Sequence, residues 1–177
     1  MSAMQHLFDK LYQKMGLQHR LGRAHDTLNQ RYGHHLIPDL RPSLGPTPWA
    51  PLRRPLSEAT VGLFTTAGVH LRSQPGFTVA PDPSYRVIPV ETPDSDLVIS
   101  HEHYNHQDAD REPELVFPLD LLRRVAGTLI SRPAAEHYGM MGYLGIENQW
   151  RLLHKATREL AERLRGSGLD AAVLTPG

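Results

Sequence analysis

A strand, a helix and a second strand follow one another near the C-terminus, and this order constrains the fold more than any other feature. Thr128–Ile130 has the composition of a short strand, and residues 148–165 repeat apolar side chains at helical spacing. Glycines end that helix, and the apolar segment 169–175 predicts a last, buried strand. Because a strand–helix–strand unit in one sheet joins parallel strands, the sequence predicts an α/β fold with a parallel or mixed sheet and helices packed on it.

Further elements precede this unit. Residues 59–64, 85–88 and 96–99 predict strands, and Pro118 predicts the start of a helix that ends at Gly127. Residues 137–143, which read HYGMMGY, predict a loop because glycines interrupt the segment. These elements place the main domain at residues 58–177.

The first 57 residues have a different character. Apolar residues at helical spacing predict helices over 3–15 and 21–33. Six prolines between Pro38 and Pro55 then disfavour both helix and central strand, so an extended connector is expected. The chain therefore divides into a helical arm with a Pro-rich connector, residues 1–57, and the α/β domain. That domain is expected to be incomplete at its C-terminus, because no helix follows its last strand.

Composition narrows the classes of function. The 19 basic and 19 acidic residues balance, which argues against binding nucleic acid or an anionic membrane surface. No apolar run is long enough to span a membrane, and the N-terminus lacks a signal pattern, so a cytoplasmic protein is expected. The absence of cysteine excludes disulfides and thiolate ligands within these residues.

The segment SHEHYNHQDAD, residues 100–110, concentrates groups that bind metals or transfer protons. His101, His103, His106 and Asp108 could offer three nitrogens and one oxygen to zinc or iron. The same imidazoles could transfer protons near neutral pH. A solvated surface loop stays a third interpretation, since the spacing matches no standard ligand motif.

A second candidate site follows the first strand of the domain. Small residues in TTAG, residues 65–68, allow a ligand to approach the backbone at Thr66 and Gly68. Ligands of open α/β sheets bind beyond the carboxyl ends of strands, and His70 lies just after this turn. A tight turn with an incidental histidine is the alternative.

Six segments together resemble one known family. The segments are TTAGVHLRSQPGF (65–77), SYRVIP (84–89), SHEHYNHQDAD (100–110), VFPLDLLRRVA (116–126), HYGMMGY (137–143) and GLDAAVLTPG (168–177). In this order they resemble the selenoprotein B family of glycine, sarcosine, betaine and D-proline reductases. The arm adds nothing to the resemblance.

The resemblance implies an oxidoreductase that reductively cleaves a carbon–nitrogen or other carbon–heteroatom bond of an amine or amino-acid derivative. Members of the family carry a selenocysteine or cysteine nucleophile just after a TPG-like segment. The nucleophile is therefore expected directly beyond Gly177, in a gene that continues in frame past a UGA codon. An imidazole would protonate the leaving group, and the candidate catalytic residues are His70, His101, His103, His106, His137 and Tyr138. Thr66, Gly68 and Gly177 would contact the substrate.

Two other functions remain open at this stage. A metal-dependent hydrolase or lyase could use the histidine segment and needs no thiol. A non-catalytic subunit of a reductase complex could bind a partner through the arm and the last strand. The apolar stripe of the arm and the uncovered strand predict a homo-oligomer or a complex with a partner subunit.

Overall fold

The computed structural model describes residues 50–78, 82–102, 104–142 and 150–177, with the side chains of 150–155 left undescribed. The predicted helices over 3–15 and 21–33, and the connector up to residue 49, lie outside the described residues. No helix in the described part is both long and apolar enough to cross a membrane.

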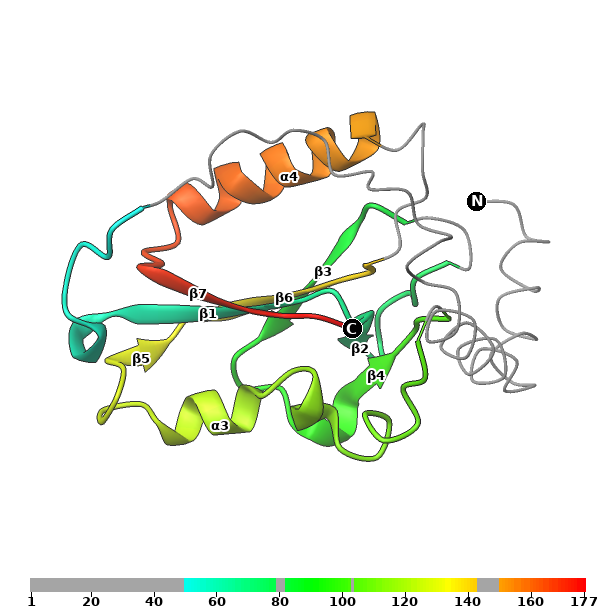
Figure 1. The fold of residues 1–177 in the computed structure, drawn as a ribbon, viewed down its shortest axis with the longest axis horizontal. Helices are drawn as coiled ribbons and strands as arrows, with labels where there is room; N and C mark the ends of the chain where they lie inside the picture. Colours follow the sequence, from blue (N-terminus) through cyan, green and yellow to red (C-terminus); the bar gives the residue numbers. More distant parts are fainter. Residues whose placement is uncertain (1–49, 79–81, 103, 143–149) are drawn as a thin grey trace, which may run out of the picture.

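The fold is built on a mixed sheet around β1 (Thr60–Thr65). On one side, β1 pairs in parallel with β7 (Ala171–Thr175). On its other side, β1 pairs in parallel with β5 (Arg132–Pro133) along its first half and with β6 (Glu136–Met140) along its second. The strand β3 (Tyr85–Pro89) is antiparallel to β6. Figure 1 shows β7 and β1 side by side, with both running toward the same edge.

A small antiparallel sheet adjoins this edge. It consists of β2 (Val69–Leu71) and β4 (Leu97–Ile99), which pair with Val69 opposite Ile99. Only three residues, 66–68, separate the end of β1 from the start of β2, so this turn links the two sheets. The predicted strands at 59–64, 85–88 and 96–99 are therefore confirmed as β1, β3 and β4.

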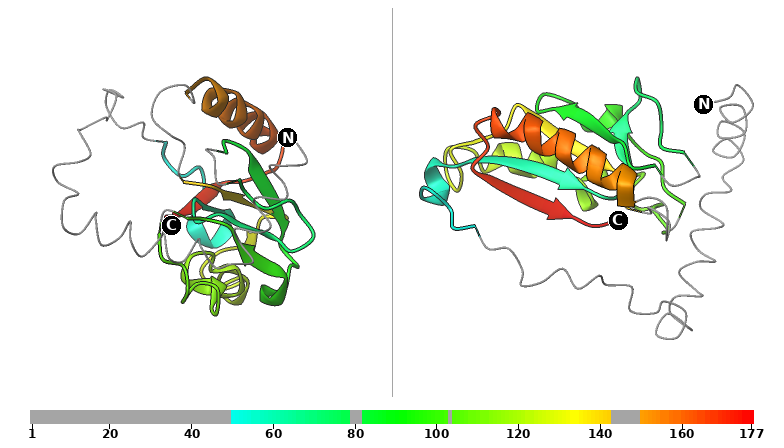
Figure 2. Two further views of the ribbon diagram at one scale, coloured as in Figure 1. Left: turned by 90° about the vertical axis from the view of Figure 1, so that its right-hand side faces the viewer. Right: turned by 90° about the horizontal axis from the view of Figure 1, so that it is seen from above.

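Helices cover the two faces of the main sheet, as Figures 1 and 2 show. The long helix α4 (Trp150–Arg165) lies on one face, and α3 (Leu119–Arg124) lies on the other. Three short 3-10 helices complete the described elements: η1 (Leu56–Glu58), η2 (Asp94–Asp96) and η3 (Pro113–Leu115). A mixed sheet with helices on both faces confirms the predicted α/β class.

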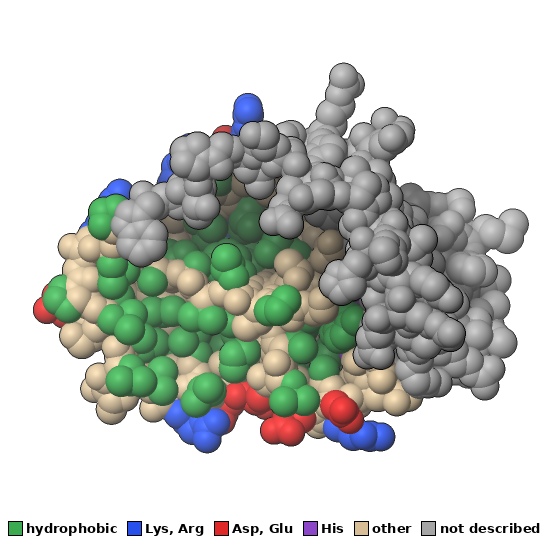
Figure 3. All heavy atoms as spheres, viewed as in Figure 1, with side chains coloured by type: hydrophobic (Ala, Val, Ile, Leu, Met, Phe, Trp, Pro, Cys, Tyr) green, Lys and Arg blue, Asp and Glu red, His purple; other side chains and the backbone are tan. Residues whose placement is uncertain are grey.

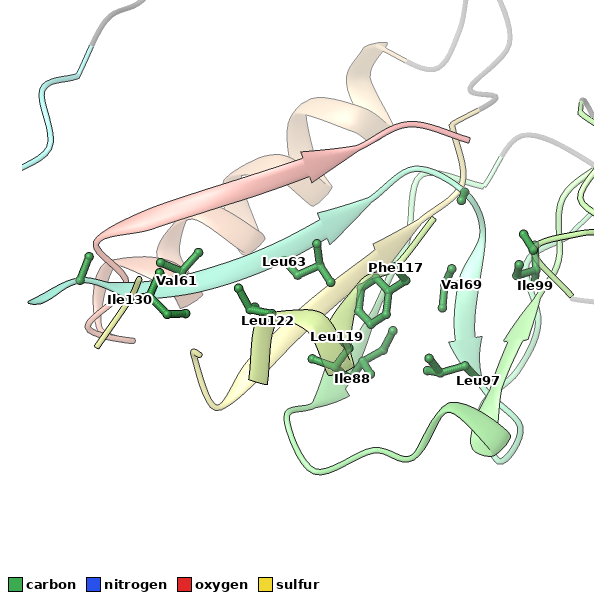
Figure 4. Close-up of a cluster of buried hydrophobic side chains, with 13 residues drawn as sticks. Val61, Leu63, Val69, Ile88, Leu97, Ile99, Phe117, Leu119, Leu122 and Ile130 are labelled. Carbon is green, nitrogen blue, oxygen red and sulfur yellow. The ribbon is translucent and has the colours of Figure 1, made fainter. Parts of the chain in front are cut away.

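The core follows from the two-residue period of β1. Leu63 points to the α3 face, where it joins the large cluster drawn in Figure 4 with Ile88 and Phe117. The next residue, Phe64, points to the α4 face and stacks on Tyr138 at 5.0 Å between ring centroids. Since both faces of β1 are buried, this strand has a nearly continuous apolar sequence.

Two predictions about local structure were wrong. Residues 128 and 129 form a turn, in which the Thr128 side-chain hydroxyl donates to the Val125 carbonyl oxygen at 2.9 Å, and Ile130 forms only an isolated bridge with Ala126. The strand in this region is β5, two residues further on. Residues 137–140, expected to be loop, belong to strand β6. Neighbours on both sides pair with β6, and this pairing overrides the low strand propensity of glycine.

The last strand is confirmed as β7, but it is not buried. Leu174 is 75% exposed and Val173 is 42% exposed. Figure 3 shows hydrophobic side chains gathered on the face of the molecule that carries β7 in Figure 1. Among the described elements, β7 pairs only with β1, so it forms an edge of the sheet.

Candidate functional site

The turn after β1 is the meeting point of four strands. The Thr66 N–H donates to the Thr175 carbonyl oxygen at the end of β7, at 3.0 Å. The Gly68 N–H donates to the Met140 carbonyl oxygen at the end of β6, at 2.8 Å, and the Ser100 N–H donates to the Gly68 carbonyl oxygen, at 2.9 Å. The carboxyl ends of β1, β4, β6 and β7 are therefore bound to one three-residue turn.

Two glycines allow this close packing. Gly68 has φ +75°, and a Cβ there would lie 2.3 Å from the Ser100 carbonyl oxygen. A Cβ on Gly177 would lie 2.3 Å from Cα of Ala67. The structure thus brings the three predicted substrate-contacting residues, Thr66, Gly68 and Gly177, to one edge of the sheet, where open α/β sheets bind ligands.

The histidine segment lies against the same turn. His101 is 6% exposed, and its ring packs edge-on against Tyr104 at 4.8 Å between centroids. The Tyr104 hydroxyl donates to the Ala67 carbonyl oxygen at 3.2 Å. Burial raises the pKa of Tyr104 well above its ordinary value, so this hydroxyl stays a neutral donor. The interpretation as a solvated surface loop is therefore wrong for His101.

His106 is completely buried and has a carboxylate partner. Its Nδ1 lies 2.9 Å from Oδ1 of Asp110, whose side chain is 33% exposed. Asp108, the residue predicted to join the histidines, faces solvent and pairs with Arg111 at 3.1 Å. His103 lies outside the described residues.

The candidate metal site stays a prediction. Within the described ranges, no three His, Asp or Glu side chains are arranged to hold a metal ion. The predicted ligands are His101, His103, His106 and Asp108. Of these, His103 lies outside the described ranges, and the carboxylate of Asp108 points to solvent. The geometry therefore supports acid–base chemistry by the histidines more directly than ligation.

His70 lies beneath the turn, on β2. Its Nδ1 donates to the Leu71 carbonyl oxygen and its Nε2 accepts from the Ser100 hydroxyl, each at 2.8 Å. Nδ1 must carry a proton, because a carbonyl oxygen only accepts, and the lowered pKa of His70 favours the neutral ring, in which Nε2 accepts. Burial, opposed by the bond to Leu71 and assisted by the charge of Arg86, lowers the pKa of His70. His70 therefore couples β2 to the segment that carries His101.

His137 points into the core below the sheet rather than to the turn. Its Nδ1 accepts the Leu63 N–H at 3.0 Å, and its ring lies edge-on to Phe117. Burial, with the nearby charge of Arg123, lowers its pKa to about 4. β1 pairs with β5 up to Val61 and with β6 from Phe64 onward, and the register of the pairing changes by two residues between these points. The His137 imidazole binds the Leu63 N–H in this gap between the two ladders.

Tyr138 points to the opposite face. Its hydroxyl donates to Oε2 of Glu136 at 3.0 Å. Arg163 of α4 binds the same carboxylate through Nε at 2.8 Å and Nη2 at 2.5 Å. The hydroxyl of Tyr138 is therefore engaged on the α4 face, away from the groups around the turn.

Four residues of the site were not among the predicted ones. Ser100, Tyr104, Asp110 and Thr175 all bind the turn or the histidines. Only one pair has a signal in the sequence: His106 and Asp110 are spaced i, i+4, which suits one helical turn. The other contacts depend on strand order, which no local pattern encodes.

The arrangement has a definite chemical capacity. Buried imidazoles and a neutral phenol surround a turn whose glycines admit close approach, at an edge reached by the end of β7. The groups gathered here are of the kinds that donate and accept protons in acid–base chemistry. A thiol or selenol for a redox step would have to come from outside these 177 residues, which include no cysteine.

Comparison with known proteins identifies a relative among reductase subunits. No protein-family model matches the chain, and no solved structure matches it. Over 137 residues, the chain is 34% identical to a protein of Acetoanaerobium sticklandii named D-proline reductase subunit gamma. The alignment covers 77% of this chain and 56% of that protein. The chain thus spans about half the length of the curated relative that it matches.

Proposed function

We propose that this chain is part of a reductase that cleaves a carbon–nitrogen bond of an amine or amino-acid derivative, with D-proline as the first substrate to test. The observation that carries the proposal is the 34% identity to a D-proline reductase subunit over 137 residues. The resemblance of six segments to the selenoprotein B family of glycine, sarcosine, betaine and D-proline reductases agrees with it.

The geometry supports a site at the turn of residues 66–68. Three of the family-like segments, 65–77, 100–110 and 168–177, are far apart in sequence but meet there through hydrogen bonds and ring contacts. A substrate bound at this edge would lie beside Gly68 and His101. The site also adjoins Gly177, after which the family carries its nucleophile.

The proposed reaction balances as a two-electron reduction. A selenolate or thiolate, placed by the resemblance just after Gly177, attacks the carbon that bears the nitrogen. The carbon–nitrogen bond breaks, and an imidazole such as that of His101 protonates the departing nitrogen. One thiol of a dithiol then attacks the selenium or sulfur, the carbon–selenium or carbon–sulfur bond breaks, and the carbon takes a proton. The second thiol displaces the selenolate or thiolate, so the dithiol leaves as its disulfide, its two electrons reduce the carbon, and its two protons go to the carbon and back to the imidazole. With D-proline, ring opening gives 5-aminopentanoate.

One observation favours a second reading, a non-catalytic subunit of such a reductase: the relative is named as a subunit. In this case a partner chain would bring the nucleophile to the same turn. The two readings share the substrate class and differ in which polypeptide carries the reactive residue.

The test uses the natural gene product, tagged at its N-terminus and purified from its source cells with whatever it binds. The preparation is incubated with dithiothreitol and, in separate arms, D-proline, L-proline, glycine, sarcosine or betaine. We expect 5-aminopentanoate from D-proline but not from L-proline, and neither acetate nor a free amine from glycine, sarcosine or betaine. Failure of every arm would overturn the proposal.

The mass and selenium content of the tagged polypeptide distinguish the two readings. A polypeptide that extends beyond Gly177 with selenium or a cysteine supports the catalytic reading. An active preparation in which only a co-purified chain holds the reactive residue supports the non-catalytic one. Sequencing the gene beyond the Gly177 codon is a direct check, with a UGA codon followed by an open frame as the expected result.

A further inference from the structure

We propose that Asp110 is a positioning residue, which sets the place of His101 and of the turn at residues 66–68 by way of His106 and Tyr104. The inference deepens the proposed function, because it assigns a role to a carboxylate that does not itself touch the turn. It rests on four contacts that form one continuous path.

The first contact fixes His106. Asp110 accepts from Nδ1 of His106 at 2.9 Å, and the Asp110 N–H donates to the His106 carbonyl oxygen at 2.8 Å. Two bonds across one turn of chain hold the pair rigidly. A carboxylate only accepts hydrogen bonds, so it selects the form of His106 with a proton on Nδ1.

The second and third contacts connect His106 to His101 through the ring of Tyr104. The ring of Tyr104 lies between two imidazoles, with centroids 5.4 Å from His106 and 4.8 Å from His101. His106 is completely buried and His101 is 6% exposed, so close packing leaves these two rings little freedom to move alone. We expect a displacement of His106 to displace Tyr104, which contacts both rings and is itself partly buried.

The fourth contact reaches the turn. The Tyr104 hydroxyl donates to the Ala67 carbonyl oxygen at 3.2 Å, and Ala67 is the residue against which Gly177 packs. On the other side of the turn, a Cβ on Gly68 would lie 3.2 Å from Cβ of His101. Asp110 is thus connected to both walls of the proposed site, while its own carboxylate is 33% exposed at the outer end.

This role makes Asp110 different from its neighbours on the same segment. Asp108 is exposed and paired with Arg111. Glu112 is exposed as well. Its backbone N–H, rather than its carboxylate, makes a hydrogen bond, which it donates to the Asp108 carbonyl oxygen. Glu112 is therefore a matched control for loss of an acid from this segment.

The test compares Asp110→Ala with Glu112→Gln by nuclear magnetic resonance of the full chain. We expect Asp110→Ala to remove the Nδ1-protonated form of His106 and to shift the Gly68 amide and the His101 side-chain resonances. Glu112→Gln should leave all three unchanged. Asp110→Asn should restore them in part, because its amide oxygen can accept the Nδ1 proton.

Tyr104→Phe separates positioning from a general loosening of the segment. This variant keeps the ring but loses the bond to Ala67, so Asp110→Ala made in the Tyr104→Phe background should shift the Gly68 amide much less than in the wild type. An unshifted Gly68 amide in Asp110→Ala, or an equal shift in both backgrounds, would overturn the inference.

The reductase assay adds a readout that stability alone would not move. In the tagged natural preparation, Asp110→Ala should lower kcat for D-proline by about 10- to 100-fold with little change in KM. An unchanged kcat in an active preparation would also overturn the inference. If the wild type is inactive, the proposed function fails, and the resonance shifts still decide whether Asp110 positions the turn.

Discussion

The backbone of Gly139 on β6 lies directly against the carbonyl group of Val69 on β2: a Cβ at position 139 would be 1.9 Å from the Val69 oxygen and 2.9 Å from its carbon. The small sheet and the main sheet therefore touch backbone to backbone. Only glycine permits this contact, because the opposing atoms are main chain and cannot rotate away.

Gly139→Ala should accordingly lower the free energy of unfolding by about 3 kcal/mol, at the upper end of the usual cost of overpacking. Urea denaturation measures the change. Gly166→Ala is the control, since a Cβ there meets nothing within 4 Å, and it should change stability by less than about 1 kcal/mol. Equal effects of the two substitutions would contradict the contact.

His137 predicts a pH dependence of stability. Its pKa is lowered from 6.5 to about 4, chiefly by burial, so the unfolded chain binds a proton that the folded chain does not. Above pH 6.5, His137 is neutral in both states and does not reduce the free energy of unfolding. As the pH falls from 6.5 to about 4, protonation of the unfolded chain lowers that free energy by about 3 kcal/mol in all.

His137→Asn tests this dependence, because the amide oxygen can still accept the Leu63 N–H but does not titrate. We expect the variant to lose less stability than the wild type between pH 7 and pH 4, measured by urea denaturation at each pH. His137→Ala should instead cost about 1 to 3 kcal/mol at pH 7, because it leaves the Leu63 N–H unpaired. Parallel pH profiles for wild type and His137→Asn would refute the assignment.

Much of the fold could be predicted from local patterns. The apolar runs of β1, β3 and β4 and the periodicity of α3 and α4 mark those elements in the sequence. The strand β6 was not predicted, because Gly139 and the polar His137 interrupt the apolar pattern that usually marks a strand. Its identity as a strand depends on pairing with β1 and β3, which are distant in sequence.

The site was predictable only in part, for a related reason. The small residues of the 66–68 turn and the histidines of 100–110 point to polar chemistry from composition alone. Their convergence follows from strand order, and the partnership of Tyr104 with Ala67 spans 37 positions. Tyr138, which the sequence groups with the candidate catalytic residues, lies apart from the turn, because side chains alternate along β6 and its ring points to the α4 face.

The carboxylate of Glu136 joins β6 to α4 through Arg163. Hydrogen bonds from Arg163 lower the pKa of Glu136, so this interaction stabilises the fold above the ordinary pKa of 4.5 and weakens as the pH falls through the lowered value. A double-mutant cycle of Glu136→Gln and Arg163→Met should give a favourable coupling at pH 7 that becomes smaller as the pH is lowered below 4.5. Because both side chains are about 40% exposed, 0.5 M salt should reduce the coupling at pH 7. A coupling independent of pH would show that packing, not charge, joins the two residues.

The edge strand β7 predicts association. Its five residues, Ala171 to Thr175, include neither a charge nor a proline, the usual devices that protect an exposed strand edge. Leu174 is 75% exposed on this edge. We therefore expect the purified chain to form dimers or larger assemblies at micromolar concentration, through contacts that include β7.

Leu174→Lys tests whether β7 is the contact. A lysine there is solvated in the free chain, so the free energy of unfolding should change by less than about 0.5 kcal/mol. At an interface the same ammonium group would be desolvated or repelled, and light scattering should show the mass falling toward that of one chain. Leu129→Lys is the matched control: Leu129 is 63% exposed in the turn before β5, and its replacement should leave the mass unchanged. A mass that falls equally in both variants would point to general solubility rather than to β7, and a mass that falls in neither would place the contact elsewhere on the chain.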